Sequence, residues 1–180
     1  MTDLSDLERV RAERDEAIHR LETAVSSCEA TIEVFYRAAV VTNRAATVEE
    51  AIGGVLPEIV PHLGAVYAQV WLISDSAPGS LAVKGAGFST EPERTASFVA
   101  ASADRQPVAA CPLIREAMRA GRTQRSDPPE TAVGDARAAA VSAAAVAQVV
   151  AMPILAFERA VGAVELLVDD LGPPEEELRM

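Results

Sequence analysis

The sequence predicts an α+β fold, an α/β sandwich in which helices cover both faces of one central antiparallel sheet. The main observation is the stretch 148–170, where the apolar runs QVVAMPIL and VGAVELLVDD flank a short segment carrying Glu158 and Arg159. This pattern is typical of two antiparallel strands joined by a tight turn. The second run is apolar on both sides apart from Glu165. Such a strand must be covered on both faces, so we expect helices or a lidded pocket over each face and this hairpin at the centre of the sheet.

Composition excludes several classes of function. The 180 residues, 49% hydrophobic and 24% charged, suit one domain with one extension. A net charge of −11 disfavours nucleic-acid and anionic-membrane partners, which are bound largely through Lys and Arg. No apolar run reaches the roughly 20 residues that span a bilayer, and the acidic N-terminus is unlike a signal peptide, so we expect a cytoplasmic protein. Two cysteines and two histidines, widely spaced, indicate no structural metal.

The first 43 residues predict a long helix that forms a dimer. A heptad repeat that starts at Leu4 has nine apolar residues among its twelve a and d positions, although Arg11 and Arg14 interrupt it. The helix would be about 60 Å long at roughly 1.5 Å per residue, so its first half should project from the domain. We expect a parallel two-helix coiled coil; the alternative is a single solvated helix that packs only its last third. The expected interface residues are Leu4, Leu7, Ile18, Leu21, Val25, Cys28, Ile32 and Phe35.

Residues 44–180 contain the elements of the folded domain. Thr47 and Glu50 form a capping box that starts a helix ending at Gly64, with two prolines that should shorten or kink it. Strands are expected at 65–74 and 81–88, helices at 93–103, 112–120 and 135–147, a short strand at 122–125, and a loop at 127–130. Residues 171–180 look like the first turn of a C-terminal helix, which suggests that the chain is cut from a longer one.

The order of these elements resembles a GAF domain. The resemblance covers 34–180 and is carried by a helix closing on LGA, the strand AVYAQVWLIS, a glycine-containing return strand, the helix PLIREAMRAGR, and the hairpin with PIL and VGAVELL. It implies that the terminal helices lie on one face of the sheet and that 89–147 covers a small-molecule pocket on the other. It also implies a sensory or regulatory module, dimerised through flanking helices and followed by an output domain such as a histidine kinase or a nucleotide cyclase.

The resemblance does not identify a ligand, so the cofactor stays unknown. Bilin-binding members attach the pigment through a Cys-His pair, whereas Cys111 is followed by Pro112. Neither His19 nor His62 is well placed to ligate haem, and the motif of cyclic-nucleotide-binding members is absent. Free methionine sulfoxide reductases need two cysteines together, and Cys28 in the long helix should not meet Cys111.

The candidate pocket residues are Tyr67, Gln69, Trp71, Cys111, Arg115, Met152 and Glu165. Tyr67, Gln69 and Trp71 share one face of a strand, where ordinary packing is the alternative to lining a pocket. Glu165 is the only charge in its strand, and either a partner such as Arg115 or an exposed strand edge would account for it as well as a ligand would. Three functions stay open: a ligand sensor, a dimerisation scaffold with a vestigial pocket, and a small thiol-dependent enzyme, for which no catalytic constellation is visible.

Overall fold

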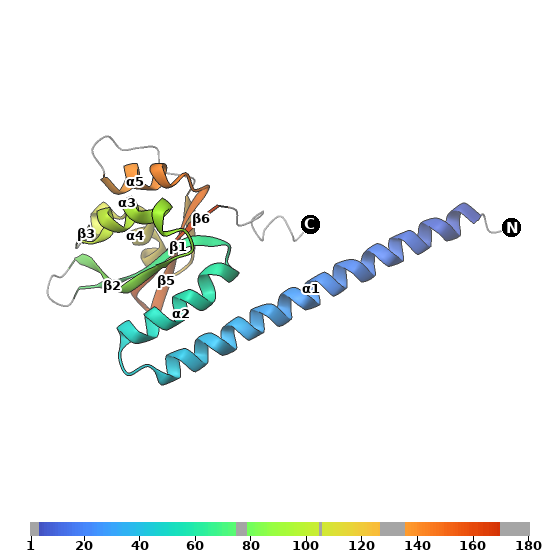
Figure 1. The fold of residues 1–180 in the computed structure, drawn as a ribbon, viewed down its shortest axis with the longest axis horizontal. Coiled ribbons are helices and arrows are strands. Elements are labelled where there is room, and N and C mark those ends of the chain that lie inside the picture. Colours follow the sequence, from blue (N-terminus) through green and yellow to red (C-terminus); the bar gives the residue numbers. More distant parts are fainter. Residues whose placement is uncertain (1–3, 75–78, 105, 127–135, 170–180) are drawn as a thin grey trace.

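A computed structural model describes residues 4–74, 79–104, 106–126 and 136–169, apart from the side chains of 4–7, 84 and 85. The elements follow one another along the chain from α1 to β6 (Figure 1). The helices are α1 (Leu4–Arg44), α2 (Val48–His62), α3 (Pro92–Ser102), η1 (Val108–Ala110), α4 (Pro112–Ala120) and α5 (Ala136–Ala144). The strands are β1 (Ala65–Ile73), β2 (Ser80–Ser89), β3 (Gln106–Pro107), β4 (Gln124–Ser126), β5 (Gln148–Ala156) and β6 (Arg159–Val168).

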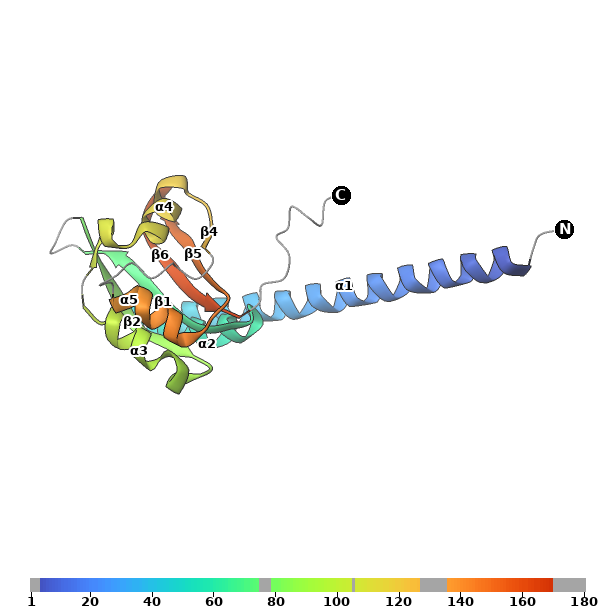
Figure 2. The same cartoon turned by 90° about the horizontal axis from the view of Figure 1, so that it is seen from above.

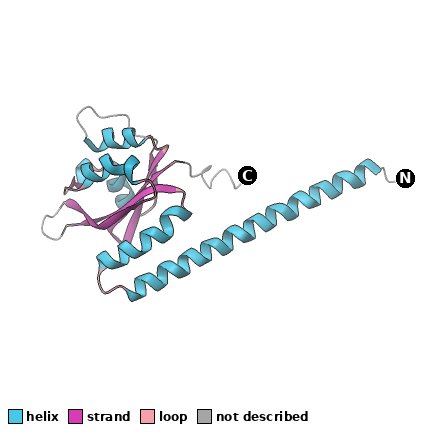
Figure 3. Ribbon diagram, in the orientation of Figure 1, coloured by secondary structure: helices cyan, strands magenta, loops and turns pink. Residues whose placement is uncertain are grey.

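The strands form one antiparallel sheet in the order β3-β2-β1-β6-β5-β4, between two helical layers (Figures 2 and 3). On one face, Leu56 and Val60 of α2 pack against aliphatic side chains of β1, β5 and β6. On the other face, Phe98 of α3, Ile114 of α4 and Val141 of α5 pack against the same three strands. The predicted α+β fold with a doubly covered antiparallel sheet is therefore confirmed. The expected loop at 127–130 and C-terminal helix at 171–180 lie outside the described residues.

The β5–β6 hairpin lies at the centre of the sheet as predicted, with β6 between β1 and β5. Its turn consists of Phe157 and Glu158, which both have left-handed φ values of 49° and 63°. Two consecutive left-handed residues match the right-handed twist of the flanking strands. Arg159, expected in the turn, is instead the first residue of β6.

A bulge at the start of β1 alters the predicted pattern of faces. The register with β6 shifts between Ala65 and Tyr67, so Val66 and Tyr67 belong to the same buried cluster under α3 and α5. Strict alternation along the strand would place Val66 on the face opposite Tyr67, and the bulge breaks this alternation. A second irregularity lies where β1 pairs with β2, at the glycine-containing bend of β2. There a Cβ atom on residue 87 would overlap the Tyr67 hydroxyl, so a larger residue than Gly87 would force Tyr67 to shift.

Helix α1 packs on α2 only along its C-terminal part (Figure 1). All residues from 8 to 30 are exposed, and the first contact is between the Thr31 hydroxyl and His62 Nε2, 3.2 Å apart. Val34 is buried against α2, whereas Ile32 and Phe35 on the heptad seam are exposed. The seam and the α2-facing stripe are thus different faces of one helix. Coiled-coil pairing stays a prediction, and the side chains of Leu4 and Leu7 lie outside the description.

Local signals account for the start of α2 and the end of α4. The Thr47 hydroxyl accepts a hydrogen bond from the Glu50 backbone N–H, and the Glu50 carboxylate accepts one from Ala46 N–H, as a capping box requires. Gly121, in the left-handed conformation at φ 63°, ends α4. Within the described part of the chain, no helix combines the length and the apolar character needed to cross a membrane.

Candidate ligand-binding site

The site is built on Glu165, a buried carboxylate in the middle of the sheet. Glu165 of β6 pairs with Gln69 of β1 and is 4% exposed. Its Oε2 atom accepts hydrogen bonds from Gln69 Nε2 and from Trp71 Nε1, both at 2.8 Å. Because side chains two residues apart on a strand point to the same face, β1 presents both donors to one carboxylate. This face is the one that α3, α4 and α5 cover.

Arg137 of α5 forms an ion pair with the Glu165 carboxylate. Its NH2 atom donates to both carboxylate oxygens of Glu165 at 2.7 Å, and the two side chains are 14% and 6% exposed. The guanidinium carbon lies 4.8 Å from the centroid of Trp71 and 5.3 Å from that of Phe98, in cation–π contact with both. Its NH1 atom donates to Cys111 Sγ at 3.1 Å. One arginine therefore joins β1, β6, α3 and the start of α4.

Tyr67 extends the network toward α3. Its hydroxyl donates to Gln69 Oε1 at 3.1 Å, and its ring meets Phe98 edge to face with centroids 5.6 Å apart. Burial, and to a lesser degree the negative charge of Glu165, raise the pKa of Tyr67 to about 12, while the positive charge of Arg137 acts in the opposite direction. The phenol is therefore neutral at physiological pH. With both ends of its amide bonded, Gln69 has a fixed orientation.

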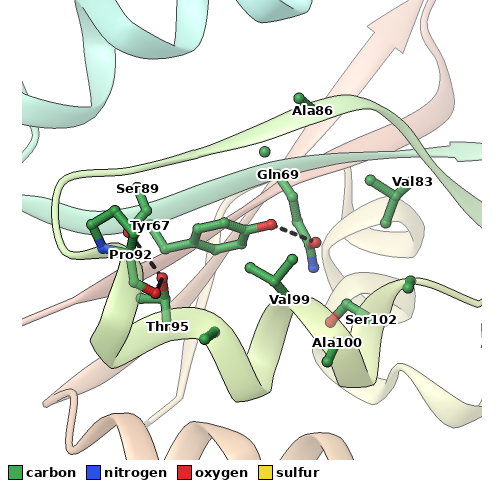
Figure 4. Close-up of a pocket in the computed structure, with 13 residues that line it drawn as sticks. Tyr67, Gln69, Val83, Ala86, Ser89, Pro92, Thr95, Val99, Ala100 and Ser102 are labelled. Atoms are coloured by element: carbon green, nitrogen blue, oxygen red, sulfur yellow. Dashed lines mark hydrogen bonds between the residues drawn. The ribbon is translucent and has the colours of Figure 1, made fainter.

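Two cavities lie on either side of this network. The first, of about 690 Å³, lies between β1, β2 and α3 and includes Tyr67 and Gln69 in its wall (Figure 4). The second, of about 410 Å³, lies between α4, α5, β5 and β6, with Arg137 and Glu165 in its wall among mainly apolar side chains. Both volumes fall in the range of small-molecule sites, roughly 300–1,000 Å³.

Five of the seven residues expected at the pocket do meet in the structure: Tyr67, Gln69, Trp71, Cys111 and Glu165. Arg115 does not join them. It is exposed on α4, because that helix turns Ile114 and Ala117 toward the sheet, so Arg137 and not Arg115 is the partner of Glu165. The alternative of an exposed strand edge is also wrong, since β6 is central.

Met152 also lies outside the site. It packs in the cluster under α2, because it is adjacent to Ala151 on β5 and therefore points to the opposite face.

Arg137 was not identified from the sequence, although the sequence contains a signal for it. Between residues 136 and 157 Arg137 is the only charged side chain, in a stretch that is otherwise almost entirely apolar. A lone charge in such a stretch needs a buried partner.

A second polar cluster ties α3 to the end of the sheet. The Arg94 guanidinium donates to both carboxylate oxygens of Asp169, at 2.7 and 2.6 Å, and to the backbone carbonyl groups of Ala144 and Ala145 at the end of α5. The hydrogen bond to Asp169 raises the pKa of Arg94, and the same bond lowers the pKa of Asp169. Asp169 immediately follows β6, so this cluster joins the cover of the first cavity to the strand that carries Glu165.

No group of three or more potential metal ligands occurs among the described residues. Of the two cysteines, Cys28 is exposed on α1 and Cys111 is buried beside Arg137. Within the described ranges, the site therefore offers hydrogen-bonding and charged groups next to apolar walls. This chemistry suits binding of a small molecule.

Comparisons with known proteins identify the fold. No protein-family model matches the chain, and neither does any curated protein. Solved structures do match, among them the GAF domain of A. aeolicus nlh2 in an inactive state, with 11% identity and a TM-score of 0.60 over 84% of this chain and 86% of that one. The GAF domain of a Coxiella burnetii phosphoenolpyruvate-protein phosphotransferase matches with 12% identity and a TM-score of 0.54, covering 81% and 82%.

A methyl-accepting chemotaxis protein is also similar, with 16% identity and a TM-score of 0.55 over 81% of this chain and 88% of that chain. At such identities the likeness concerns the fold. The antiparallel sheet with helices on both faces agrees with this fold. The described part of this chain is a long N-terminal helix followed by a domain with the GAF fold.

Proposed function

We propose that this chain is a sensory or regulatory module of a signalling protein, which binds a small molecule beneath α3, α4 and α5. The observation that carries the proposal is the buried Glu165–Arg137 pair with a cavity on each side. Removing two charges from water costs several kcal/mol per ion, and packed apolar side chains would serve stability as well or better. A charged, hydrogen-bonded network bordered by cavities fits recognition better than it fits a dry scaffold.

The bound state would be relayed through helices to an output domain, for which a histidine kinase or a cyclase is our expectation. The exposed seam on α1, which includes Ile18, Leu21 and Val25, supports pairing with a second copy. A dimer would bring the two domains into one unit through their α1 helices. We expect the module to have no turnover of its own and to act in the cytoplasm, without nucleic-acid or membrane partners.

Ligand binding is tested on the full chain by native mass spectrometry of gently purified protein, followed by a thermal-shift screen of a metabolite library. A true ligand should add its mass to the folded protein only. Hydrogen exchange should then show new protection in 92–144, where the covering helices lie, while 148–168 exchanges slowly with or without ligand. If no compound binds and 92–144 is already protected in the free protein, the scaffold function replaces the sensor.

Dimerisation is tested by light scattering at tens of micromolar. Leu21→Glu puts a charge into the seam and should shift the full chain from dimer toward monomer. Thr23→Glu is the matched control, because Thr23 is exposed on the opposite side of the helix and should leave the dimer intact. In a parallel, in-register pair, mild oxidation should also link the two Cys28 residues, and Cys28→Ser should remove the link. A wild-type monomer would refute the pairing.

A further inference from the structure

The first cavity is a cleft between α3 and β2 whose described walls carry no charge. Its polar groups come from Tyr67 and Gln69 on β1, Ser89 at the end of β2, and Thr95 and Ser102 on α3. Figure 4 shows Tyr67 and Gln69 extending from one side of the cleft, with Val99 and Ser102 facing them from α3. Most of the remaining wall is apolar or formed by small residues. Several of these, such as Ala96 and Val99, are exposed, so the cleft is open to solvent.

Ser102 is the unusual member of this wall. Ser102 is only 1% exposed, yet its hydroxyl has no hydrogen-bond partner within the part of the chain that the structure describes. Thr95, seven residues earlier on the same helix, shows the ordinary situation, because its hydroxyl bonds to Ser89 Oγ at 2.9 Å and to the Glu91 carbonyl at 3.2 Å. A buried hydroxyl without a partner costs about 1–3 kcal/mol. A ligand group that pairs with Ser102 would recover that cost.

The other groups limit what such a ligand can offer. Each end of the Gln69 amide already makes one hydrogen bond, since its oxygen accepts from Tyr67 and its nitrogen donates to Glu165. The Tyr67 hydroxyl donates its proton in the hydrogen bond to Gln69, so its oxygen can only accept a further hydrogen bond. Ser102 has one proton to donate and two lone pairs. The Tyr67 oxygen on β1 therefore offers an acceptor, and the Ser102 hydroxyl on α3 offers both a donor and an acceptor.

Charge limits the ligand further. The described side chains that line the cleft carry no charge, and the two ionised groups of the network behind Gln69, Glu165 and Arg137, are bound to each other. An ionised ligand group placed against Tyr67 and Ser102 would lose water without gaining an ion partner from the described wall, which is unfavourable. A neutral group avoids this loss.

Resting on the function proposed above, we infer that the α3–β2 cleft binds an uncharged ligand that donates a hydrogen bond to Tyr67 and exchanges one with Ser102, with an apolar body beside Val99. A primary carboxamide on a ring has this combination of groups, because its NH2 donates and its carbonyl oxygen accepts. The inference names both the position of the ligand and its chemical class.

Three probes of nearly the same shape test the charge: benzamide is neutral, benzoate is negative and benzamidine is positive. Each is titrated to tens of millimolar into the ¹⁵N-labelled full chain, and shifts are followed at the α3 amides and at the Trp71 indole. Benzamide should shift the amides near Val99 and Ser102 and bind at least about tenfold more tightly than either charged probe. Tighter binding of benzoate or benzamidine would overturn the inference, as would no binding of benzamide.

Two serine variants test the position. Ser102→Ala should weaken benzamide binding about five- to tenfold, as expected for one lost hydrogen bond. It should not destabilise the fold, because it removes an unsatisfied group. Ser97→Ala is the control on the same helix, where Ser97 is exposed, and should leave binding unchanged. Equal binding to both variants would refute the role of Ser102. Probe shifts confined to the second cavity, around Cys111 and Arg137, would refute this inference while still supporting the sensor function.

Discussion

Replacing Arg137 by methionine removes the guanidinium that Glu165 contacts but keeps most of the apolar volume of the side chain. The Glu165 carboxylate would keep the Gln69 and Trp71 bonds and lose its countercharge. Since the two side chains are only 14% and 6% exposed, solvent would screen little of the remaining charge. Breaking a buried pair on one side costs about 3–5 kcal/mol. This is a large part of the roughly 5–15 kcal/mol by which domains are stable.

Urea unfolding followed by tryptophan fluorescence measures this cost directly. The chain has a single tryptophan, Trp71, which is fully buried and bonded to Glu165, so the signal reports on the site and not on the long α1 helix. Arg115→Met on α4 is the matched control. Arg115 is exposed, and its loss should change the free energy of unfolding by less than about 0.5 kcal/mol.

A double-mutant cycle separates the pair from ordinary packing. Glu165→Gln keeps an oxygen for the Gln69 and Trp71 donors and removes the charge, so it should cost about 1–3 kcal/mol alone. Combined with Arg137→Met, it removes the uncompensated carboxylate. The double variant should therefore be more stable than the sum of the single changes by at least about 1.5 kcal/mol. Additive costs, or a cost below about 1 kcal/mol for Arg137→Met, would refute the buried ion pair.

Three further changes test other parts of the structure. In a Tyr36→Phe variant, which leaves Tyr67 as the only tyrosine, absorbance at alkaline pH should show Tyr67 ionising near pH 12. Because the pKa of Tyr67 in the folded protein lies above the ordinary 10.0, the free energy of unfolding should fall as the pH rises from 10 to 12. A midpoint near pH 10 in the folded protein would contradict the burial of Tyr67. Gly53→Ala should stabilise the protein by about 0.5–1 kcal/mol in chemical unfolding, because the added Cβ has no neighbour. Gly54→Ala should destabilise it by about 1–3 kcal/mol, because the added Cβ overlaps Val41 of α1. Equal effects of the two variants would show that α1 does not pack on α2 at this point. Because the hydrogen bond with Arg94 lowers the pKa of Asp169, the ionised carboxylate stabilises the fold above pH 3.8, and this stabilisation is lost as the pH falls further. Asp169→Asn should therefore be less stable than wild type at neutral pH and equal to it in strong acid. Chemical unfolding of both proteins at the two pH values measures this difference.

Sequence reasoning works here where the signal is local. The hairpin turn, the capping box at Thr47 and the end of α4 at Gly121 depend on residues within a few positions of one another. The faces of β1 were predicted from strict alternation, which holds from Tyr67 onward and fails at Val66, where a bulge inserts one residue. A bulge depends on how the neighbouring strand pairs, and a two-residue period carries no information on that.

The candidate site shows the same division. Tyr67, Gln69 and Trp71 were placed together correctly because they share one strand face, and Glu165 stood out as a lone charge. Its partner was not predictable in the same way, because Arg137 lies 28 residues away and meets Glu165 only when α5 packs over the sheet. Met152 was expected at the pocket, but Ala151 is the residue of β5 that pairs with Glu165, so the adjacent Met152 points to the α2 face.

Helix α3 connects the two polar clusters and so gives the proposed relay a physical route. Its eleven residues span about 16 Å at roughly 1.5 Å per residue, with Ser102 in the cleft wall at one end and Arg94 near the other. A ligand that moves α3 relative to β2 must therefore change either the Arg94–Asp169 bond or the helix itself. A ligand in the second cavity would act on α5 through Arg137, and Arg94 also holds the C-terminal carbonyl groups of α5. Ligands in either cavity would thus act on Arg94, which is bonded to Asp169 directly after β6.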